Sequence, residues 1–325
     1  MNTLFLRYLK EMQNKGRLKF YENHSLSLVS TFGIGGKARV FVIPYDTDTL
    51  CDTVTLAASA GRYIIIGNAS NLLFDDRGFS GTVISTARVR AVELTEIERV
   101  GKTGGCERVI SALCGVSLPQ LSAFALRNGI TGFEGLCSIP ATVGGALCQN
   151  AGAYGQAISD TLIAYEAFYP DKREKRTVFV GGECFSYRKS PIGKQGEAVL
   201  CAYFRAESAE CGQILEKMEK NKACRLASQP IGARSAGSYF RRPEGADGKS
   251  AGELIDKSGL KGLSVGGAEV SVKHANFIIN KSGSATACDV LRLADTVKKT
   301  VFLNCGVMLC EEVEFIPRHG RRRKR

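Results

Sequence analysis

The chain has 325 residues, of which 44% are hydrophobic and 23% are charged. These values are typical of globular proteins, and the length suggests about two domains. No stretch approaches the roughly 18 uninterrupted apolar residues that a membrane helix needs, so we expect no membrane span. The charged start of the chain lacks the apolar core of a secretory signal, which favours a cytoplasmic location.

The net charge of +12 is concentrated at the end of the chain. Residues 317–325 hold six Lys or Arg and no acid, which leaves a net charge of +6 for the remainder. Such a tail can contact nucleic acid or an anionic membrane, or it can be a disordered, solvated terminus. We favour the disordered terminus. A net charge of +6 on the rest of the chain is compatible with an enzyme that binds phosphorylated ligands, but it does not require such a function.

The twelve cysteines do not form a recognisable metal or disulfide framework. No C-x-x-C pair occurs, and the three histidines His24, His274 and His319 lie far apart in the sequence. Zinc and iron–sulfur sites therefore find little support, and we predict no metal. We expect the thiols to be reduced and buried as small apolar side chains.

Apolar periodicity and turn residues predict an α+β chain with many short strands. The predicted helices are Leu4 to Met12, Ser117 to Gly129, Glu210 to Leu226, and a long helix from near Ser284 to Gly306. The predicted strands are Val40 to Ile43, Tyr63 to Ile66, Thr82 to Ile84, Val109 to Leu113, Tyr165 to Tyr169, Thr177 to Val180, Ala198 to Phe204 and Phe277 to Asn280. The main domain boundary is placed near Ser208.

Two clusters of small residues are candidates for binding a diphosphate. The first runs from Gly67 to Asn71, directly after a predicted strand, and the second runs from Ile139 to Ala146. Small residues allow backbone N–H groups to converge on an anion. Each cluster alone could be a plain turn or a close backbone contact, but two of them favour one extended cofactor. No complete G-x-G-x-x-G follows a strand, so a Rossmann site is unsupported.

Motifs that run in order along almost the whole chain resemble the UDP-N-acetylenolpyruvoylglucosamine reductase family. They are TFGIGG at 31–36, GNASNLLFDDRGFSG at 67–81, GITGFEGLCSIPATVGGALCQNAGAYG at 129–155, FSYRKS at 185–190, SAGSYF at 235–240, LIDKSGLKG at 254–262, VSVKHANFIIN at 270–280 and GVMLCEEVEFI at 306–316. About fifty residues separate FSYRKS from SAGSYF, which resembles the shorter form of the family without the extra loop over the substrate.

The resemblance implies an α+β fold in which a two-subdomain FAD-binding fold of the PCMH type precedes an α+β substrate-binding domain. The implied parts are FAD-binding subdomains at 1–88 and 89–208, a substrate-binding domain at 209–317 and the basic tail at 318–325. The implied activity is that of a flavoenzyme of bacterial cell-wall synthesis. NADPH reduces non-covalently bound FAD, which passes a hydride to the enolpyruvyl ether of UDP-N-acetylglucosamine enolpyruvate and gives UDP-N-acetylmuramate.

The resemblance also implies the residues of each site. The expected FAD contacts are Gly67, Asn68, Ala69, Ser70, Asn71, Leu72, Ser138, Ile139, Thr142, Gly144, Gly145 and Ala146. The expected contacts to the UDP-sugar are Tyr154, Tyr187, Arg242, Lys261 and His274. Two of these residues also have a purely structural interpretation. His274 could be a histidine whose hydrogen bonds are satisfied within a strand, and Tyr154 could pack against neighbouring side chains instead of lining the pocket.

The implied catalytic residues are Arg188, Ser238 and Glu312. A guanidinium can bind a carboxylate bidentately and stabilise the charge that follows hydride addition. Ser238 matches the family's proton donor, and Glu312 matches the glutamate that stabilises the intermediate. Taken singly, these residues could be a surface ion pair, a turn residue and an exposed strand position.

The chain departs from the family pattern at two places. Cys310 replaces the first acid of the common Glu-x-Glu, so only Glu312 is carried over. Arg241-Arg242-Pro243 replaces Lys-Asn-Pro, which puts an asparagine contact to the substrate in doubt and suggests that Arg242 meets a phosphate.

Two other functions would explain part of the sequence. One is a flavin oxidase of the same superfamily, many of which attach the flavin through a histidine in the first phosphate loop, but no histidine lies between Gly61 and Gly81. The other is a basic nucleic-acid-binding protein, which would leave both glycine clusters unexplained. We therefore predict a UDP-sugar substrate and no obligatory nucleic acid.

Overall fold

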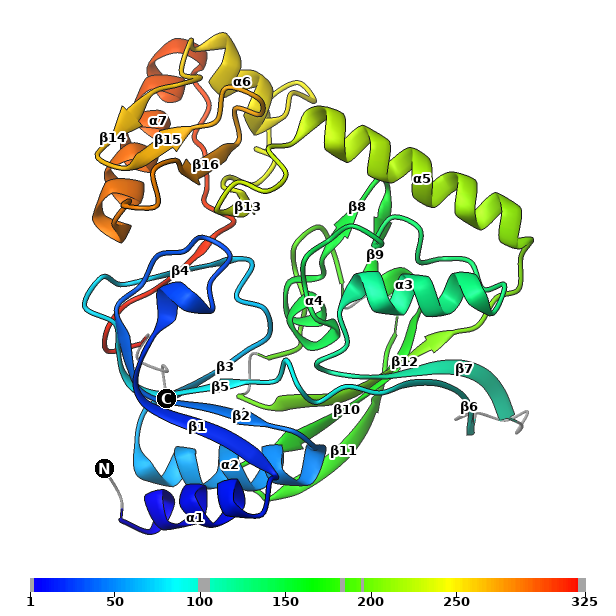
Figure 1. Cartoon of the computed structure of the whole chain (residues 1–325). Coiled ribbons are helices and arrows are strands. Elements are labelled where there is room, and N and C mark those ends of the chain that lie inside the picture. The colour runs from blue at the N-terminus through cyan, green and yellow to red at the C-terminus, as the bar shows by residue number, and fades with distance from the viewer. Residues whose placement is uncertain (1–2, 99–105, 182–184, 194–195, 321–325) are drawn as a thin grey trace. The chain divides into compact units, whose positions relative to one another are not determined.

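A computed structural model describes residues 3–98, 106–181, 185–193 and 196–320 (Figure 1). The chain divides into two compact units, and each is built from several segments. Unit 1 comprises Met1–Tyr21, Phe41–Asn68 and Val83–Cys224. Unit 2 comprises Glu22–Val40, Ala69–Thr82 and Arg225–Arg325.

Two helices at the start of unit 1 lie side by side (Figure 1). Helix α1 (Thr3–Asn14) buries Phe5 and Leu9, which lie four residues apart and therefore on one face of the helix. Helix α2 (Thr47–Ala60) begins at Asp46, whose carboxylate accepts the N–H of Thr49 at 2.9 Å. This bond satisfies one of the backbone donors that every helix leaves open at its start.

A five-stranded antiparallel sheet forms the centre of unit 1. Its order is β11-β10-β12-β7-β6, with β6 Val92–Glu98, β7 Cys106–Leu113, β10 Leu162–Tyr169, β11 Glu174–Phe179 and β12 Ala198–Arg205. The middle strand β12 is buried along most of its length, from Ala198 to Ala202 and again at Phe204. A nearly continuous apolar strand of this kind is typical of a sheet covered on both faces.

Three further helices begin in unit 1. Helix α3 (Leu118–Arg127) begins with a capping box between Ser117 and Gln120 and has a proline in its first turn. Helix α4 (Val143–Gln149) ends at Asn150, which adopts the left-handed conformation. Helix α5 (Cys211–Ser228) follows the last strand of the unit and extends into unit 2 at Arg225. The short strands β8 (Gly152–Ala153) and β9 (Gln156–Ala157) form a small hairpin after α4.

The first sheet of the chain has the order β1-β2-β5-β3. Its strands are β1 Leu18–Ser25, β2 Lys37–Pro44, β3 Tyr63–Ile66 and β5 Phe79–Ser85. The unit boundaries fall within β1, β2 and β5, so each of these strands contributes residues to both units. A 3-10 helix at Leu26–Leu28 follows β1, and another at Ile158–Asp160 follows β9.

Unit 2 has its own sheet, core and long helix. The sheet has the order β13-β16-β15-β14, with β13 Ser235–Ser238, β14 Ser264–Val265, β15 Ala268–Val270 and β16 Phe277–Asn280. Helix α7 (Ala287–Cys305) packs against β14, β15 and α6 (Ala251–Lys257). Strand β17 (Glu314–Ile316) pairs in parallel with β4 (Leu72–Phe74), which returns the end of the chain to its first quarter.

Most predicted elements are confirmed, and the omissions have a physical reason. Helix α7 ends at Gly306 as predicted, with that glycine in the left-handed conformation at φ 69°. Helix α2 was not predicted; it contains four threonines, residues with low intrinsic helix propensity. The cap at Asp46 and packing against α1 favour the helix there in spite of that composition.

The expectation that the cysteines are buried is only partly correct. None of the described cysteines forms a disulfide. Four are buried (Cys51, Cys114, Cys137 and Cys201), but five are exposed (Cys106, Cys211, Cys224, Cys288 and Cys310). The error arises because an apolar neighbour in sequence does not place a residue on the buried face. On α5, for example, Ile214 and Met218 are buried, whereas Cys224 lies on another face and Cys211, the first residue of the helix, is exposed.

Two further findings concern the whole described chain. No helix among the described residues is long and apolar enough to cross a membrane. Residues 321–325 of the predicted tail lie outside the described residues. Arg318, at the start of the tail, makes two backbone hydrogen bonds. Its N–H donates to Asp75 at 3.3 Å, and its carbonyl accepts the N–H of Ser80 at 2.8 Å.

Asp75 provides a test of how this part of unit 2 is held together. A bidentate bond from the Arg77 guanidinium and N–H bonds from Arg77 and Arg318 lower the pKa of Asp75 from 3.8 to about 2. A lowered pKa stabilises the folded state above the unfolded pKa, and this stabilisation is lost as the pH falls through the folded pKa. The shift corresponds to about 2 kcal/mol, which we reduce to about 1 kcal/mol because Arg77 is largely exposed.

We therefore expect Asp75→Asn to lower the free energy of unfolding by about 1 kcal/mol at pH 6. The loss should shrink as the pH falls from 4 towards 2, as measured by urea unfolding. Asp52→Asn is the control of opposite sign, because burial and the nearby Asp48 and Asp46 raise the pKa of Asp52. A destabilisation by Asp75→Asn that does not change with pH would contradict the ionic origin of the effect.

Candidate functional site

The structure brings the two predicted phosphate-binding segments together within unit 1. Gly67 lies so close to Thr142 that a Cβ on Gly67 would be 2.1 Å from the Thr142 hydroxyl oxygen. The Asn68 side chain donates to the carbonyl of Pro140 at 3.4 Å. Any side chain at position 67 would therefore separate the two segments. The two predicted segments therefore contact each other in the structure, while their individual ligand contacts stay predictions.

The backbone around Thr142 fixes the second segment. Thr142 is the N-cap of α4, and its hydroxyl accepts the N–H of Gly145 at 3.4 Å. The N–H groups of Val143 and Gly144 donate to the carbonyls of Val116 and Cys114 at 2.8 and 2.9 Å. These bonds join α4 to the loop after β7, so the segment is positioned by the central sheet of the unit.

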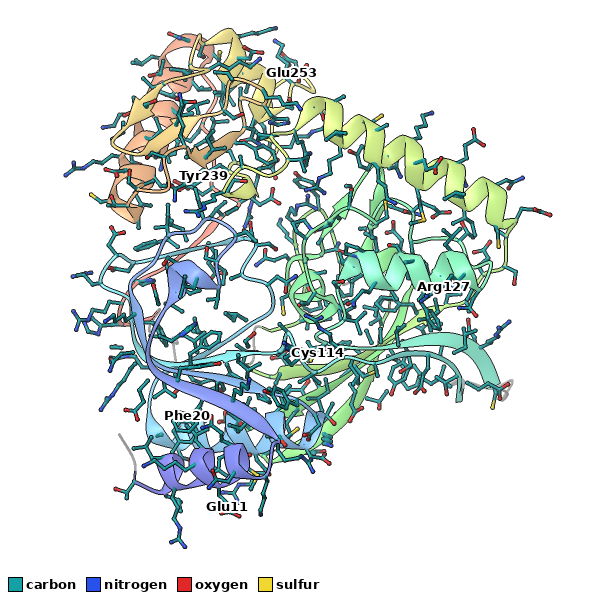
Figure 2. All side chains as sticks on the ribbon, in the orientation of Figure 1. Glu11, Phe20, Cys114, Arg127, Tyr239 and Glu253 are labelled. Atoms are coloured by element: carbon teal, nitrogen blue, oxygen red, sulfur yellow. The ribbon has the colours of Figure 1, made fainter. Side chains whose placement is uncertain are left out.

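The adjacent glycines Gly144 and Gly145 have different surroundings. A Cβ on Gly144 would lie 3.1 Å from the Cβ of Cys114, a buried residue labelled in Figure 2. A Cβ on Gly145 would meet only the Thr142 hydroxyl, at 3.4 Å, among the described atoms within 4 Å. A side chain at Gly144 would thus press against Cys114. Gly145 instead presents a backbone that a ligand can approach.

A buried hydroxyl lies next to this segment in the sequence. Ser138 Oγ is buried and makes no hydrogen bond to any of the described residues. Leaving a buried polar atom unsatisfied costs about 1–3 kcal/mol, so such atoms in native proteins often bond to a ligand or to water. Together with the open face of Gly145, Ser138 fits a bound group that carries hydrogen-bonding oxygens, such as a cofactor with phosphates and hydroxyls.

The first loop continues from unit 1 into unit 2 between Asn68 and Ala69. Ala69 is buried and adopts the left-handed conformation at φ 50°, which turns the chain sharply. Asn71 then makes two bonds to the segment near the end of the chain. Its side chain donates to the carbonyl of Glu312 at 3.1 Å, and its own carbonyl accepts the N–H of Glu314 at 3.0 Å. The predicted cofactor loop is therefore bonded to the segment that carries Glu312.

Within unit 2 the structure also brings Ser238 next to the Glu312 segment. Ser238 is the last residue of β13, half-buried, and pairs with Phe277 of β16. The carbonyl of the following residue, Tyr239, accepts the N–H of Glu312 at 2.8 Å (Tyr239 is labelled in Figure 2). Two of the three predicted catalytic residues thus lie on adjacent backbone segments, as the sequence alone could not show.

Tyr239 itself is an apolar support for this pair. It is buried, with its ring edge-on to Phe240 at 5.0 Å. Burial, together with the negative charges of Glu311 and Asp295, raises the pKa of Tyr239 above its ordinary value. The phenol therefore stays protonated at neutral pH.

Arg188, the third predicted catalytic residue, lies in unit 1 on a tight turn. Ser186 and Lys189 form an isolated bridge, with mutual backbone bonds of 3.2 and 2.9 Å. Arg188 itself has φ 52°, in the left-handed region. Its guanidinium donates to the carbonyls of Asn150 at 3.4 Å and Gly152 at 3.0 Å, and its carbon atom Cζ lies 5.1 Å from the centre of the Tyr187 ring.

The predicted substrate contacts are divided between the units. Tyr154 and Tyr187 belong to unit 1 and are exposed. Arg242, Lys261 and His274 belong to unit 2. Tyr154 is held in the left-handed region at φ 53°, which is an uncommon conformation for an aromatic residue.

His274 and Lys261 each have a defined setting. The ring of His274 lies edge-on to Phe277 at 4.8 Å, and its Nδ1 accepts the N–H of Asn276 at 3.2 Å. Burial lowers the pKa of His274, and nearby Lys261 adds to that effect. Lys261 also forms an ion pair with Asp256 at 2.6 Å. A neutral His274 is therefore favoured at physiological pH.

Sequence reasoning missed Glu134, which supports the second segment. Its side chain is 3% exposed and accepts bonds from Thr131 Oγ1 at 2.6 Å, the Gly132 N–H at 2.9 Å and Gln156 Nε2 at 3.1 Å. Burial acts to raise the pKa of Glu134, but these hydrogen bonds outweigh it and lower the pKa overall. The sequence did contain a signal for this role, because Glu134 is an isolated acidic residue within a glycine-rich motif. No group of three or more metal-ligating side chains occurs within the described part of the chain.

Comparisons with known proteins give consistent matches along the chain. Residues 229–316 match the model of the UDP-N-acetylenolpyruvoylglucosamine reductase C-terminal domain, and residues 38–177 match an FAD binding domain. A UDP-N-acetylenolpyruvoylglucosamine reductase of Carboxydothermus hydrogenoformans is 39% identical over 91% of this chain and 93% of its own. The Heliobacterium modesticaldum protein of that name is 36% identical over 94% of this chain and 93% of its own.

The structural comparison agrees with the sequence comparison. The crystal structure of the UDP-N-acetylenolpyruvylglucosamine reductase from Thermus caldophilus superposes with a TM-score of 0.71 at 32% identity. The match covers 92% of this chain and 98% of that one. The predicted fold class, an FAD-binding fold of the PCMH type followed by an α+β domain, is thereby confirmed.

The environment of Gly145 gives a test of cofactor binding. Gly145→Leu should give a folded protein that does not retain FAD, because the added side chain meets little protein and occupies the space a ligand needs. The measurement is the ratio of flavin to protein absorbance after purification, with circular dichroism to confirm folding. Gly212→Leu, on an exposed helix position with no neighbouring atom within 4 Å, is the matched control. Normal FAD content in Gly145→Leu would remove this segment from the cofactor site.

Proposed function

The chain belongs to the UDP-N-acetylenolpyruvoylglucosamine reductase family, and we propose from this premise how its own residues carry out the reaction. The enzyme is an FAD-dependent oxidoreductase that reduces the C=C bond of UDP-N-acetylglucosamine enolpyruvate and gives UDP-N-acetylmuramate for peptidoglycan synthesis. The observation that carries this conclusion is 39% identity to such a reductase over 91% of the chain.

The residues around Gly67 and Thr142 fit non-covalent FAD. When bound, FAD supplies the hydride for the double bond after reduction by NADPH. The loop from Gly67 to Leu72 and the segment Ser138 to Ala146 would hold its diphosphate through backbone N–H groups and the Ser138 hydroxyl. No histidine occurs between Gly61 and Gly81, so this loop offers no imidazole for a covalent bond to the flavin.

Arg188 is assigned to the carboxylate of the enolpyruvyl group. Hydride addition at the β carbon leaves negative charge at the α carbon, delocalised onto the carboxylate. A guanidinium stays protonated throughout and can bind that carboxylate through two parallel N–H bonds. The carbonyls of Asn150 and Gly152 orient the group without cancelling its charge, because both are neutral acceptors. Charge stabilisation by a preorganised donor is commonly the largest contribution to such catalysis.

Ser238 is assigned the proton transfer to the α carbon. Its hydroxyl lies at the end of β13 in a half-buried position, where solvent competes less for the proton than at the surface. General acids contribute roughly 100- to 10,000-fold to the rate. Glu312 is assigned to stabilising or polarising the intermediate. The bond from its N–H to the Tyr239 carbonyl, at 2.8 Å, supports a fixed position relative to the serine strand.

The remaining assignments extend the proposal to the whole chain. Residues 1–88 and 89–208 are proposed as the FAD-binding subdomains and 209–317 as the substrate-binding domain. The proposed contacts to the UDP-sugar are Tyr154, Tyr187, Arg242, Lys261 and His274. Among them, Arg242 is proposed to bind a phosphate. We also propose that the enzyme acts in the cytoplasm and needs neither nucleic acid nor metal.

Anaerobic half-reactions test the function directly. The purified yellow protein should be bleached by NADPH and should recover its flavin absorbance when UDP-N-acetylglucosamine enolpyruvate is added. UDP-N-acetylglucosamine, which has the same nucleotide sugar but no enolpyruvyl double bond, should leave the flavin reduced. Recovery with both compounds, or with neither, would contradict the proposed substrate.

The role of Ser238 predicts an effect on only one half-reaction. Ser238→Ala should leave flavin reduction by NADPH unchanged and slow reoxidation by the enolpyruvyl substrate by roughly 100-fold or more. Ser238→Cys should retain more activity than Ser238→Ala, because a thiol still carries a transferable proton. Stopped-flow absorbance measures the two steps separately. If Ser238→Ala slowed reduction and spared reoxidation, the serine would not be the proton donor.

A further inference from the structure

Asn150 contacts the turn that carries Arg188 at two points. It follows α4 directly as the helix C-cap, and its side chain is buried. The side-chain amide donates to the carbonyl of Ser186 at 3.0 Å, which fixes the beginning of the turn. The backbone carbonyl of Asn150 accepts from Arg188 Nη1 at 3.4 Å, which fixes the far end of the arginine side chain.

Both contacts depend on the backbone conformation of Asn150. With φ 44° and ψ 57°, the residue is in the left-handed region. Asparagine is one of the few residues other than glycine that adopt this conformation readily. The chain reverses there, and the carbonyls of Asn150 and Gly152 both become acceptors for one guanidinium. A residue that continued the helix would not present the two carbonyls in this way.

The buried side chain of Asn150 is not fully satisfied. Its Oδ1 is buried and accepts no hydrogen bond from any described residue. An apolar side chain would avoid that cost, so stability alone does not explain an amide at this position. Among the described residues, the bond that the amide makes is the one to the turn bearing Arg188. The observation links Asn150 to the placement of that arginine.

We propose that Asn150 is a positioning residue that acts through Arg188. Its amide and its left-handed carbonyl together hold the guanidinium in the orientation that binds the substrate carboxylate. This inference rests on the carboxylate-binding role proposed above for Arg188. Asn150 itself has no role in proton or hydride transfer.

Two substitutions separate the amide from the backbone conformation. Asn150→Gly retains the left-handed conformation at no steric cost and removes only the side chain. Asn150→Asp keeps the size of the side chain, but an ionised carboxylate cannot donate to the Ser186 carbonyl. The control is Asn128→Gly. Asn128 also follows a helix, α3, and its amide donates to the carbonyl of Phe124 at 2.9 Å, away from the Arg188 turn.

The first measurement is ligand binding without turnover. Isothermal titration calorimetry of the oxidised holoenzyme should show about tenfold weaker binding of UDP-N-acetylglucosamine enolpyruvate to Asn150→Gly and Asn150→Asp. Binding of UDP-N-acetylglucosamine, which lacks the carboxylate, should be unchanged in both variants. Asn128→Gly should bind both ligands as the unmodified enzyme does. Equal weakening for both ligands would mean that Asn150 supports the fold in general, and the inference would be wrong.

The second measurement is a double-mutant cycle on flavin reoxidation. Misplacing a catalytic group by about 1 Å can cost roughly 100-fold, so Asn150→Gly should slow reoxidation by about 10- to 100-fold and spare reduction by NADPH. In an Arg188→Ala background the same change should have almost no further effect, because the group that it positions is gone. An equal slowing in both backgrounds would show that Asn150 acts independently of Arg188.

The Arg188→Ala arm distinguishes the two proposals. If Arg188→Ala alone bound the enolpyruvyl substrate and reoxidised at the unmodified rate, the assignment of Arg188 would be wrong. If Arg188→Ala were impaired while both Asn150 variants matched the unmodified enzyme, only the positioning role would be wrong. Should Asn150→Gly fail to fold, the same comparisons apply to Asn150→Asp.

Discussion

The absence of a side chain at Gly67 is the constraint on which the candidate site depends. A Cβ there would lie 2.1 Å from the Thr142 hydroxyl, a distance that real atoms do not adopt. Because position 67 is a glycine, the end of β3 can contact the start of α4, and Asn68 can reach the Pro140 carbonyl. Two loops separated by some seventy residues thereby form one small-residue surface. The second loop carries the open face of Gly145, and next to it in the sequence is Ser138, whose hydroxyl has no hydrogen-bond partner among the described residues.

The same loop also organises the part of unit 2 that carries Ser238 and Glu312. Asn71 holds the Glu312 carbonyl with its side chain and the Glu314 N–H with its backbone. The Glu312 N–H in turn donates to the carbonyl of Tyr239, the residue after Ser238. Each such bond contributes only about 1 kcal/mol to stability. These bonds act on position, because the backbones of Ser238 and Glu312, the residues proposed to be catalytic, are fixed by main-chain contacts rather than by flexible side chains.

Arg188 shows how local strain can be offset by its surroundings. A left-handed conformation costs a residue other than glycine roughly 1–2 kcal/mol. Two hydrogen bonds from the guanidinium to carbonyls and the contact with the Tyr187 ring are together of that order. These contacts therefore offset the cost of the left-handed conformation. In that conformation the guanidinium of Arg188 faces the carbonyls of Asn150 and Gly152. Strain of this kind is concentrated at functional sites in other proteins as well.

The sequence by itself determined the family, the cofactor and most regular elements. Ordered motifs carry that information, and the apolar periodicity of α7 together with its terminal Gly306 is a local property of the chain. It did not reveal α2, whose low propensity is overridden by capping and packing, nor the exposure of cysteines such as Cys211. Only the tertiary structure decided that Asn71 holds Glu312 and that Asn150 holds the Arg188 turn. The physical reason is that these bonds join residues far apart in the chain, whose meeting depends on how strands and helices pack, whereas motifs and periodicity report only on neighbours in sequence.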